Sequence, residues 1–423
     1  MVVGTFSMDE ELVTQRMLIA QIQNNLEGKA FGGDNAISRV IKPKDVNFYD
    51  YDGTLLHSYS IAQAQILTEL PTLPSHEGLI CQGWNYDLET IKAHNRAINV
   101  GATYITDDGK TRLYIRIAAE DRMAVPLSFS QTISNGVTID WGDGSTTQTL
   151  SGDGHKEVIH SYASIGDYVI TLDVASGCIL GLSDNNSSYD GVMGPRDNVG
   201  CVYRNLLQKV EIGNGITCIH NYAFCECYSL TSITIPNNIT SIETYAFQKC
   251  YSLTSVTIPD SVTSIGYNAF YSCYSLTSII IPNSVTSIAI SMVSNCTSLA
   301  NVTISDSVTS IGRSAFSGNV SLAIITIPSN VMSIGSMAFS DCHSLTRITI
   351  PNGVASIGEL TFADCYGVTT YDFTSHTSIP TLSATNAFRE IPSDCIIKVP
   401  AALYDEWRTA TNWLTYAKYI VAV

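Results

Sequence analysis

The chain has 423 residues, an apolar fraction of 45% and a formal net charge of −16. Its length predicts about two to four folded units. The acidic excess, most of which precedes residue 205, argues against a nucleic-acid partner and an anionic membrane surface, because both need clustered Lys and Arg. The chain contains no run of about 18 apolar residues, so we expect no membrane insertion.

Residues 1–44 are predicted to form an N-terminal helix and a linker. The helix spans 9–27 with heptad-like apolar spacing, and the linker, 28–44, is interrupted by glycines. Two interpretations stay open for the helix: a docked end helix, or a segment through which the chain forms a homo-oligomer. The first residues lack a basic stretch followed by an apolar core, so we expect no signal peptide in this chain.

The segment 45–112 predicts a small α+β domain. Residues 46–50 and 54–59 are strand-like around a turn at Asp52-Gly53, and 87–95 is helical. A second hairpin is expected to turn at Asp108-Gly109.

Within this domain, residues 50–54 read Asp-Tyr-Asp-Gly-Thr. They resemble the D-x-D-G-T signature of haloacid-dehalogenase phosphatases, a resemblance that implies a nucleophilic Asp50, an acid/base Asp52 and bound Mg²⁺. Such chemistry needs a parallel α/β domain with further metal ligands, but all-β sequence begins soon afterwards. A phosphatase is therefore only a remote alternative.

Residues 113–178 consist of strand-like and turn-like segments. They contain Trp141-Gly142-Asp143-Gly144 and later His160-x-Tyr162 and Gly166-Asp167-Tyr168. These motifs resemble the polycystic-kidney-disease (PKD) domain, an immunoglobulin-like β-sandwich, which implies a spacer or binding module without catalysis. Residues 179–204 are rich in Gly, Asn, Ser and Asp and are predicted to form a linker.

A unit of 23 residues repeats within 205–400, and 401–423 is expected to close the array as a helical cap. Leu230, Ile233 and Ile235 alternate with Ser and Thr, which predicts a short strand that Pro236 ends. Ala246 and Phe247 follow, and both are expected to be buried against the next coil. Such a period is typical of a solenoid whose units bury their apolar faces only against each other.

Half of the twelve cysteines recur at this period, which predicts a column of small buried side chains rather than disulfides. Asn319 occupies one position of the column, and no C-x-x-C pair occurs. We therefore expect no metal site and no cofactor.

The unit resembles the BspA-type leucine-rich repeat, L-x-x-I-x-I-P-x-x-V-x-x-I-G-x-x-A-F-x-x-C. Departures occur at Met292-Val293, at Ser305 and at Asn319. The resemblance implies a surface protein that binds matrix proteins or cells. The N-terminal half is also similar to chains encoded by gut bacteria and their phages. The predicted fold is thus mainly β with short helices: a leucine-rich-repeat solenoid preceded by a PKD-like sandwich and a small α+β domain.

Outward-facing columns supply the candidate ligand-binding residues. Rows of tyrosines give rigid amphipathic contact area, and Ser/Thr strand positions suit polar partners. Both patterns also fit plain stacking or strand-favouring choices. The candidates are Tyr228, Tyr251, Tyr274, Tyr366, Thr234, Thr257, Thr303 and Arg347.

The sequence carries no G-x-S-x-G, H-E-x-x-H or P-loop motif, so we expect no enzyme. The hypothesis is a non-enzymatic adhesion protein, extracellular or at a cell surface, that binds a protein or glycan receptor on bacterial or host cells or matrix. The alternative is a phage virion or tail protein that binds a receptor.

Overall fold

The computed structural model describes residues 46–49, 55–75, 79–84, 88–93, 98–106, 108–183, 191–194 and 200–423. The chain divides into two compact units, Met1–Gly109 and Lys110–Val423. The predicted helix at 9–27, the linker at 28–44 and the Asp-Tyr-Asp-Gly-Thr motif lie outside the described residues.

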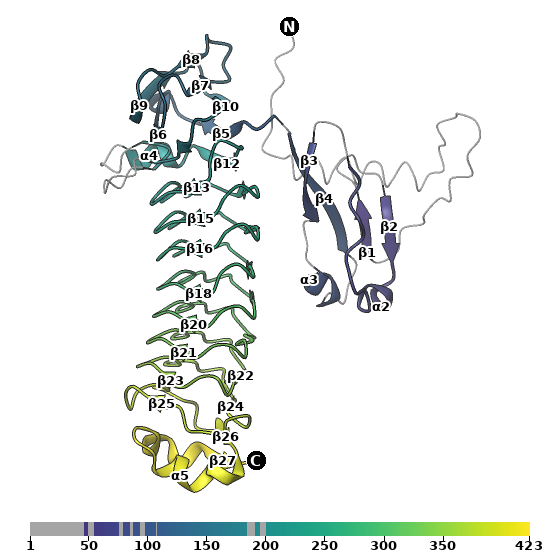
Figure 1. The fold of residues 1–423 in the computed structure, drawn as a ribbon, viewed down its shortest axis with the longest axis vertical. Helices are drawn as coiled ribbons and strands as arrows, with labels where there is room; N and C mark the ends of the chain where they lie inside the picture. The colour runs from purple at the N-terminus through teal and green to yellow at the C-terminus, as the bar shows by residue number, and fades with distance from the viewer. Residues whose placement is uncertain are drawn as a thin grey trace, which may run out of the picture. The chain divides into compact units, whose positions relative to one another are not determined.

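The first unit contains a four-stranded sheet in the order β2-β1-β4-β3 (Figure 1). Strand β1 pairs antiparallel with β2 and parallel with β4, and β3 pairs antiparallel with β4. Val46, Phe48 and Val100 of the sheet are buried together with Ala64 and Ile91 of the two helices. The elements are β1 (Val46–Tyr49), β2 (Leu55–Tyr59), α2 (Ile61–Ala64), β3 (Leu79–Trp84), α3 (Leu88–Ala93) and β4 (Ile98–Thr106).

The two strands predicted around Asp52-Gly53 are confirmed, but the hairpin predicted at Asp108-Gly109 is wrong. Strand β5 (Thr111–Ile117) does not pair with β4. It pairs antiparallel with β10 (Gly166–Val174) and belongs to the second unit. A left-handed turn does occur at Gly109, with φ of 67°. The Asp-Gly pair therefore marks a turn, as predicted, but β5 pairs with a strand distant in sequence instead of with β4.

The second unit begins with two facing sheets that share a core. One sheet contains β5, β10, β7 (Val137–Asp140) and β8 (Gln148–Thr149), and the other contains β11 (Leu180–Gly181), β6 (Ala124–Gln131) and β9 (Gly154–Ser161). A short 3-10 helix, Glu120–Arg122, precedes β6. Leu113 of β5, Phe129 of β6 and Ile170 of β10 are fully buried within one apolar cluster. The segment predicted as a sandwich, 113–178, thus contributes to two facing sheets, and β11 adds residues beyond its predicted end.

The Trp-Gly-Asp-Gly turn is fixed from several sides. His160 stacks on Trp141 with ring centroids 4.7 Å apart, and its Nε2 lies 2.7 Å from Oδ2 of Asp143. Burial alone would raise the pKa of Asp143, but hydrogen bonds from Ser145 and His160 lower it to about 2. The hydroxyl of Tyr162 donates to the Trp141 carbonyl. His160 is thus a structural residue of this turn.

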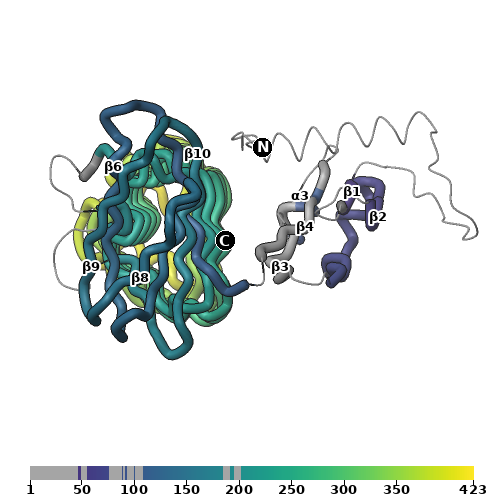
Figure 2. The backbone as a smooth tube through the Cα atoms, turned by 90° about the horizontal axis from the view of Figure 1, so that it is seen from above, coloured from purple at the N-terminus to yellow at the C-terminus, as the bar shows by residue number. Residues whose placement is uncertain are grey.

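The sandwich and the array form one continuous structure. Strand β12 (Leu207–Glu211) pairs antiparallel with β5 of the sandwich and parallel with β14 (Ser232–Thr234) of the array. The resulting six-stranded sheet has the order β14-β12-β5-β10-β7-β8. Figure 2 looks along the stacked coils, with the sandwich strands lying over their first turn. The sandwich therefore covers the end of the solenoid, as a terminal cap must.

The linker predicted at 179–204 is wrong for its described residues. Leu180 lies in β11, and Val192 and Met193 are fully buried in the core that joins sandwich and array. Helix α4 (Gly200–Arg204) ends in Arg204, which is itself fully buried. Its guanidinium donates to the carbonyls of Cys225 and Gly194. The polar composition of this segment suggested a linker, but its apolar residues pack between the sandwich and the array.

The array is a stack of coils held together by two ladders of short parallel strands (Figure 1). Most coils add one short strand to each ladder, although 253–258 and 322–327 form no strand in the first ladder. Equivalent residues of successive units lie side by side. The first ladder contains β12, β14, β17 (Ser278–Ile281), β19 (Asn301–Ile304), β22 (Arg347–Thr349), β24 (Thr370–Asp372), β26 (Ile396–Val399) and β27 (Ile420–Ala422). The second contains β13 (Cys218–Ile219), β15 (Ser241–Ile242), β16 (Ser264–Ile265), β18 (Ser287–Ile288), β20 (Ser310–Ile311), β21 (Ser333–Ile334), β23 (Ser356–Ile357) and β25 (Thr381–Leu382).

The inside of the array is a set of stacked columns, as predicted. The rings of Phe224, Phe247 and Phe270 stack at 5.3 and 5.1 Å, close to the spacing of paired strands. Val293 interrupts this column, and Met292 fills the position that alanine holds in neighbouring coils. The phenylalanine column therefore forms two blocks, the second of which begins at Phe316.

The cysteine column binds each coil to the one before it. The thiols of Cys250, Cys273 and Cys342 donate to phenylalanine carbonyls of the preceding coil at 3.1 to 3.2 Å. Burial raises the pKa of all three thiols well above the ordinary value. Asn319 makes the equivalent bond to the Val293 carbonyl and also accepts the amide N–H of Cys296. Asparagine thus replaces cysteine without leaving a buried group unpaired.

The last coil is covered by a compact helical segment. It consists of the 3-10 helix Ala401–Leu403, α5 (Tyr404–Thr409) and the 3-10 helix Trp413–Tyr419. Trp407 and Trp413 are buried against Phe373, with ring centroids 5.5 and 5.3 Å away. These rings close the open end of the core.

Candidate functional site

Three tyrosines of successive coils form a stacked row at the surface, which we call the aromatic ladder: Tyr228, Tyr251 and Tyr274. Their ring centroids are 4.8 and 4.6 Å apart, with interplanar angles of 22° and 9°. Tyr228 and Tyr251 are half-buried, whereas Tyr274 is 41% exposed. The row is therefore partly exposed to solvent while its ring faces are stacked.

Charged and polar groups lie beside the ladder. Lys249 Nζ is 2.8 Å from Oε1 of Glu226, and hydrogen bonding to this carboxylate raises the pKa of the lysine. The pKa of Tyr251 is also raised, by partial burial and by the neighbouring Tyr274. The surface thus combines a stack of phenols with a fixed ammonium–carboxylate pair.

A second pair of tyrosines stacks on the same coils. The rings of Tyr222 and Tyr245 lie 4.9 Å apart, and both residues have the left-handed backbone conformation that each coil needs before its buried Ala-Phe pair. Tyr267 of the following coil is 54% exposed. Aromatic side chains are therefore concentrated on the first coils of the array.

Later coils fill the ladder column differently. Thr297, Val320 and His343 follow Tyr274 at the repeat spacing, and Tyr366 comes next. Tyr366 is 57% exposed, contacts the tilted ring of His343 at a centroid distance of 5.1 Å and donates to Asp364. The structure thus groups Tyr228, Tyr251 and Tyr274 but places Tyr366 apart, farther along the array.

The remaining candidates lie in strands of the first ladder, except Thr257, whose coil forms no strand there. Thr257 and Thr303 are exposed, and Thr234 is half-buried. Arg347 is exposed at the start of β22 and forms an ion pair with Asp372 of the next coil. The three threonines lie at equivalent positions of different coils, and Arg347 lies two positions earlier in its own coil. The structure does not gather the four residues into a single site.

Other threonines of the array have a structural role. The hydroxyls of Thr231, Thr254 and Thr277 each donate to a carbonyl of the preceding coil, at 2.9, 3.5 and 3.2 Å. Thr263 and Thr309 do the same in another column. Much of the Ser/Thr pattern therefore supports stacking, so the tyrosines carry more weight as ligand-binding candidates.

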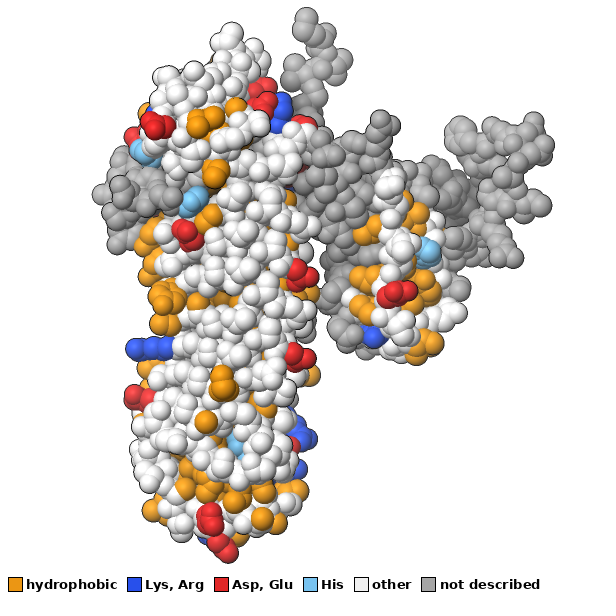
Figure 3. All heavy atoms as spheres, in the orientation of Figure 1, with side chains coloured by type: hydrophobic (Ala, Val, Ile, Leu, Met, Phe, Trp, Pro, Cys, Tyr) orange, Lys and Arg blue, Asp and Glu red, His pale blue; other side chains and the backbone are white. Residues whose placement is uncertain are grey.

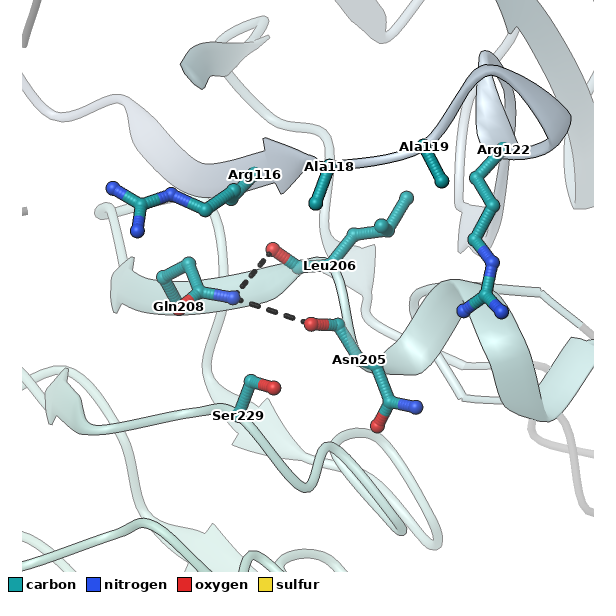
Figure 4. Close-up of a pocket in the computed structure, with 8 residues that line it drawn as sticks. All are labelled: Arg116, Ala118, Ala119, Arg122, Asn205, Leu206, Gln208 and Ser229. Atoms are coloured by element: carbon teal, nitrogen blue, oxygen red, sulfur yellow. Dashed lines mark hydrogen bonds between the residues drawn. The ribbon is translucent and has the colours of Figure 1, made fainter. Parts of the chain in front are cut away.

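A pocket of about 340 Å³ lies where the sandwich meets the first coil (Figure 4). Arg116 and Arg122 contribute to its wall, but Arg116 is paired with Asp167 and Arg122 donates to the Val202 carbonyl. Gln208 donates to the carbonyls of Asn205 and Leu206. The lining includes no His, Cys, Asp or Glu, so it brings together no acid/base pair and no activated nucleophile.

Cys218, His220 and Glu243 form a cluster that the sequence analysis missed. Their ligand-type atoms all lie within 4.8 Å of one another. The spacing along the chain matches no metal motif, because Glu243 comes from the next coil. The available signal was a departure from the repeat: Cys218 replaces a serine, and His220 and Glu243 stand where later coils carry glycine or alanine.

The visible face of the array is mostly uncharged, with isolated charged side chains (Figure 3). Among the described residues, no helix has the length and apolar character required to cross a membrane.

The stacked coils define a solenoid built from leucine-rich repeats. Residues 199–323 and 263–395 match the family described as "BspA type Leucine rich repeat region". The array is therefore a BspA-type leucine-rich repeat region. The resemblance of the sandwich to the PKD domain stays a prediction.

Several solved structures are similar to part of the chain. A leucine-rich repeat protein from Bacteroides ovatus is 24% identical over 46% of this chain and 56% of its own, with a TM-score of 0.38. A leucine rich cell surface protein from Faecalibacterium prausnitzii is 26% identical over 41% and 61%, with a TM-score of 0.27. The chain thus spans little more than half the length of these two proteins. No curated protein matches the sequence.

Proposed function

We propose that this protein is a non-enzymatic adhesion protein whose leucine-rich repeats bind a protein or glycan on a cell or matrix surface. The single observation that carries the proposal is the aromatic ladder. Tyrosine combines a large rigid ring with a polar hydroxyl, which makes it frequent in protein and sugar recognition.

The confinement of the ladder to three coils favours recognition over packing. The same column holds Thr297 and Val320 in coils with the same backbone, so the fold does not require tyrosine there. The buried columns depart from their pattern in single coils, whereas the ladder column holds tyrosine in three successive coils and other residues in the next three. The neighbouring Lys249–Glu226 pair adds donors and an acceptor at fixed positions.

The setting we propose is extracellular or on a cell surface. It is supported by the BspA-type repeats and by the similarity to a protein described as a cell surface protein. The phage setting rests on the sequence resemblance alone and remains the alternative.

The test is binding of the labelled full chain to intact bacteria and to immobilised matrix proteins. The full chain is needed because a fragment starting at 205 would lose β5, the antiparallel partner of β12. We expect saturable binding to one of these surfaces, and a loss of at least about tenfold in affinity when Tyr228, Tyr251 and Tyr274 are all changed to Ala. Tyr366→Ala is the matched control in the same column.

Binding to matrix would support an adhesin, and binding to bacteria alone would favour the phage alternative. If the full chain binds neither bacteria nor matrix proteins, the proposal is contradicted. Full binding by the triple variant would show that the ladder is not the recognition surface.

A further inference from the structure

Cys218, His220 and Glu243 form a compact group of metal-ligand side chains at the sandwich end of the array. Cys218 and His220 belong to one coil, and Glu243 belongs to the next. Cys218 Sγ lies 3.3 Å from Oε1 of Glu243. Zinc bonds of about 2.0–2.3 Å in tetrahedral geometry place neighbouring ligand atoms roughly 3.3–3.7 Å apart. Small side-chain movements would therefore bring all three groups into one coordination shell.

We propose that these three side chains bind a zinc ion that links the first two coils beside the sandwich. Thiolate, imidazole and carboxylate are all zinc ligands, and three protein ligands leave a fourth position for water. Among the described residues, this is the group of three ligand-type side chains that lies close enough for one ion.

All three residues depart from the repeat, and they do so together. Cys218 is paired in register with Ser241, which is paired with Ser264, and the following coils keep serine as far as Ser356. The position of His220 and Glu243 becomes glycine at Gly266, Gly312, Gly335 and Gly358. An added Cβ at Gly266 would approach the backbone of the preceding coil to 2.4 Å, so the coil geometry favours glycine here. The side chains of the cluster are thus not required by the solenoid.

His220 is held as a ligand would be. It is only 9% exposed, and its buried Nδ1 has no hydrogen-bond partner. An unpaired buried polar atom ordinarily destabilises a fold. The ring packs against Gly181 of β11, where an added Cβ would lie 3.0 Å from Cε1 and 3.2 Å from Nδ1. The absence of a side chain at Gly181 therefore makes room for the imidazole.

The other two ligands are oriented by neighbouring donors. The amide N–H of Asn221 donates to Oε2 of Glu243 at 2.9 Å, and the Ser241 hydroxyl donates to Cys218 Sγ at 3.0 Å. Outer partners of this kind fix the direction of metal ligands. Burial and the nearby Glu243 raise the pKa of the free Cys218 thiol to about 12. Zinc binding would replace the S–H bond by a zinc–sulfur bond and release the proton to solvent.

The test is zinc binding by the purified full chain, measured by metal analysis after dialysis and by titration with Co²⁺ as a spectroscopic probe. We expect one ion per chain and a near-ultraviolet charge-transfer band that reports a cobalt–thiolate bond. Cys218→Ser installs the residue of the later coils, so the variant should fold, and it should lose the band. Its affinity should fall by more than the roughly 10–100-fold that loss of an outer partner costs.

His220→Gly and Glu243→Gly also install the residue of later coils and should weaken binding in the same way. Cys178→Ser, which changes a buried free cysteine outside the cluster, is the matched control and should bind one ion. Circular dichroism of each variant checks the fold. Failure of the full chain to bind stoichiometric zinc or cobalt, or binding unchanged by all three ligand substitutions, would overturn the proposal and leave a hydrogen-bonded junction.

Discussion

The first coils of the array and the later coils share one backbone but carry different surfaces. In both, phenylalanines stack at 5.1 to 5.6 Å, and cysteine thiols donate to the coil before. The first coils add the aromatic ladder and the Cys218–His220–Glu243 cluster, whereas the later coils carry Thr297, Val320, serine and glycine at the same positions. The comparison teaches that the later coils show what the fold needs, and that the additional groups of the first coils need another explanation.

The largest expected effect is on the core that both regions share. Phe247→Ala in the first block and Phe316→Ala in the second should each lower the free energy of unfolding by about 3–5 kcal/mol, since each removes a fully buried ring. Chemical denaturation of the full chain measures this. A cost below about 1 kcal/mol in either block would contradict the shared core.

A smaller effect is expected where one later coil departs from the cysteine column. Asn319→Ala should destabilise the chain by about 1–3 kcal/mol, because it leaves the Cys296 amide and the Val293 carbonyl without their buried partner. Cys342→Ala, which removes only a weak thiol donor, is the matched control. Equal costs for the two variants would show that the asparagine bonds add nothing.

The smallest expected effect concerns the left-handed backbone position before each Ala-Phe pair. Ser314 has φ of 53°, a conformation costly for a residue with a side chain. Ser314→Gly should stabilise the chain by about 0.5–1 kcal/mol after the entropy cost of glycine. Gly318→Ala, at φ of 75° and with Asn295 against the new Cβ, should have the opposite sign in the same denaturation experiment. A loss of stability in Ser314→Gly would contradict the assignment of strain.

Periodicity made the array predictable. Leu230, Ile233 and Phe247 are buried as their spacing indicates, and the tyrosine column stacks as its period requires. The sequence shows where the repeat is broken, as at Met292-Val293. Only the structure shows that Met292 fills the core in the coil where valine replaces phenylalanine.

Long-range pairing was not predictable from the sequence. The Asp-Gly signal at 108–109 marks a real turn, yet β5 pairs with β10 and β12 instead of β4. The polar composition of 179–204 suggested a linker, although Val192 and Met193 are buried. The zinc-ligand cluster joins residues of two coils, so no local motif announces it. In each case the deciding contact lies between segments that are separated along the chain.

The most direct test of the central claim compares two tyrosines of one column. The dissociation constant of the full chain for the cell or matrix surface that it binds should be measured for Tyr251→Ala, in the centre of the ladder, and for Tyr366→Ala, outside it. The account predicts a loss of at least about tenfold for Tyr251→Ala and little change for Tyr366→Ala. Equal affinities for the two variants would contradict the assignment of recognition to the first coils.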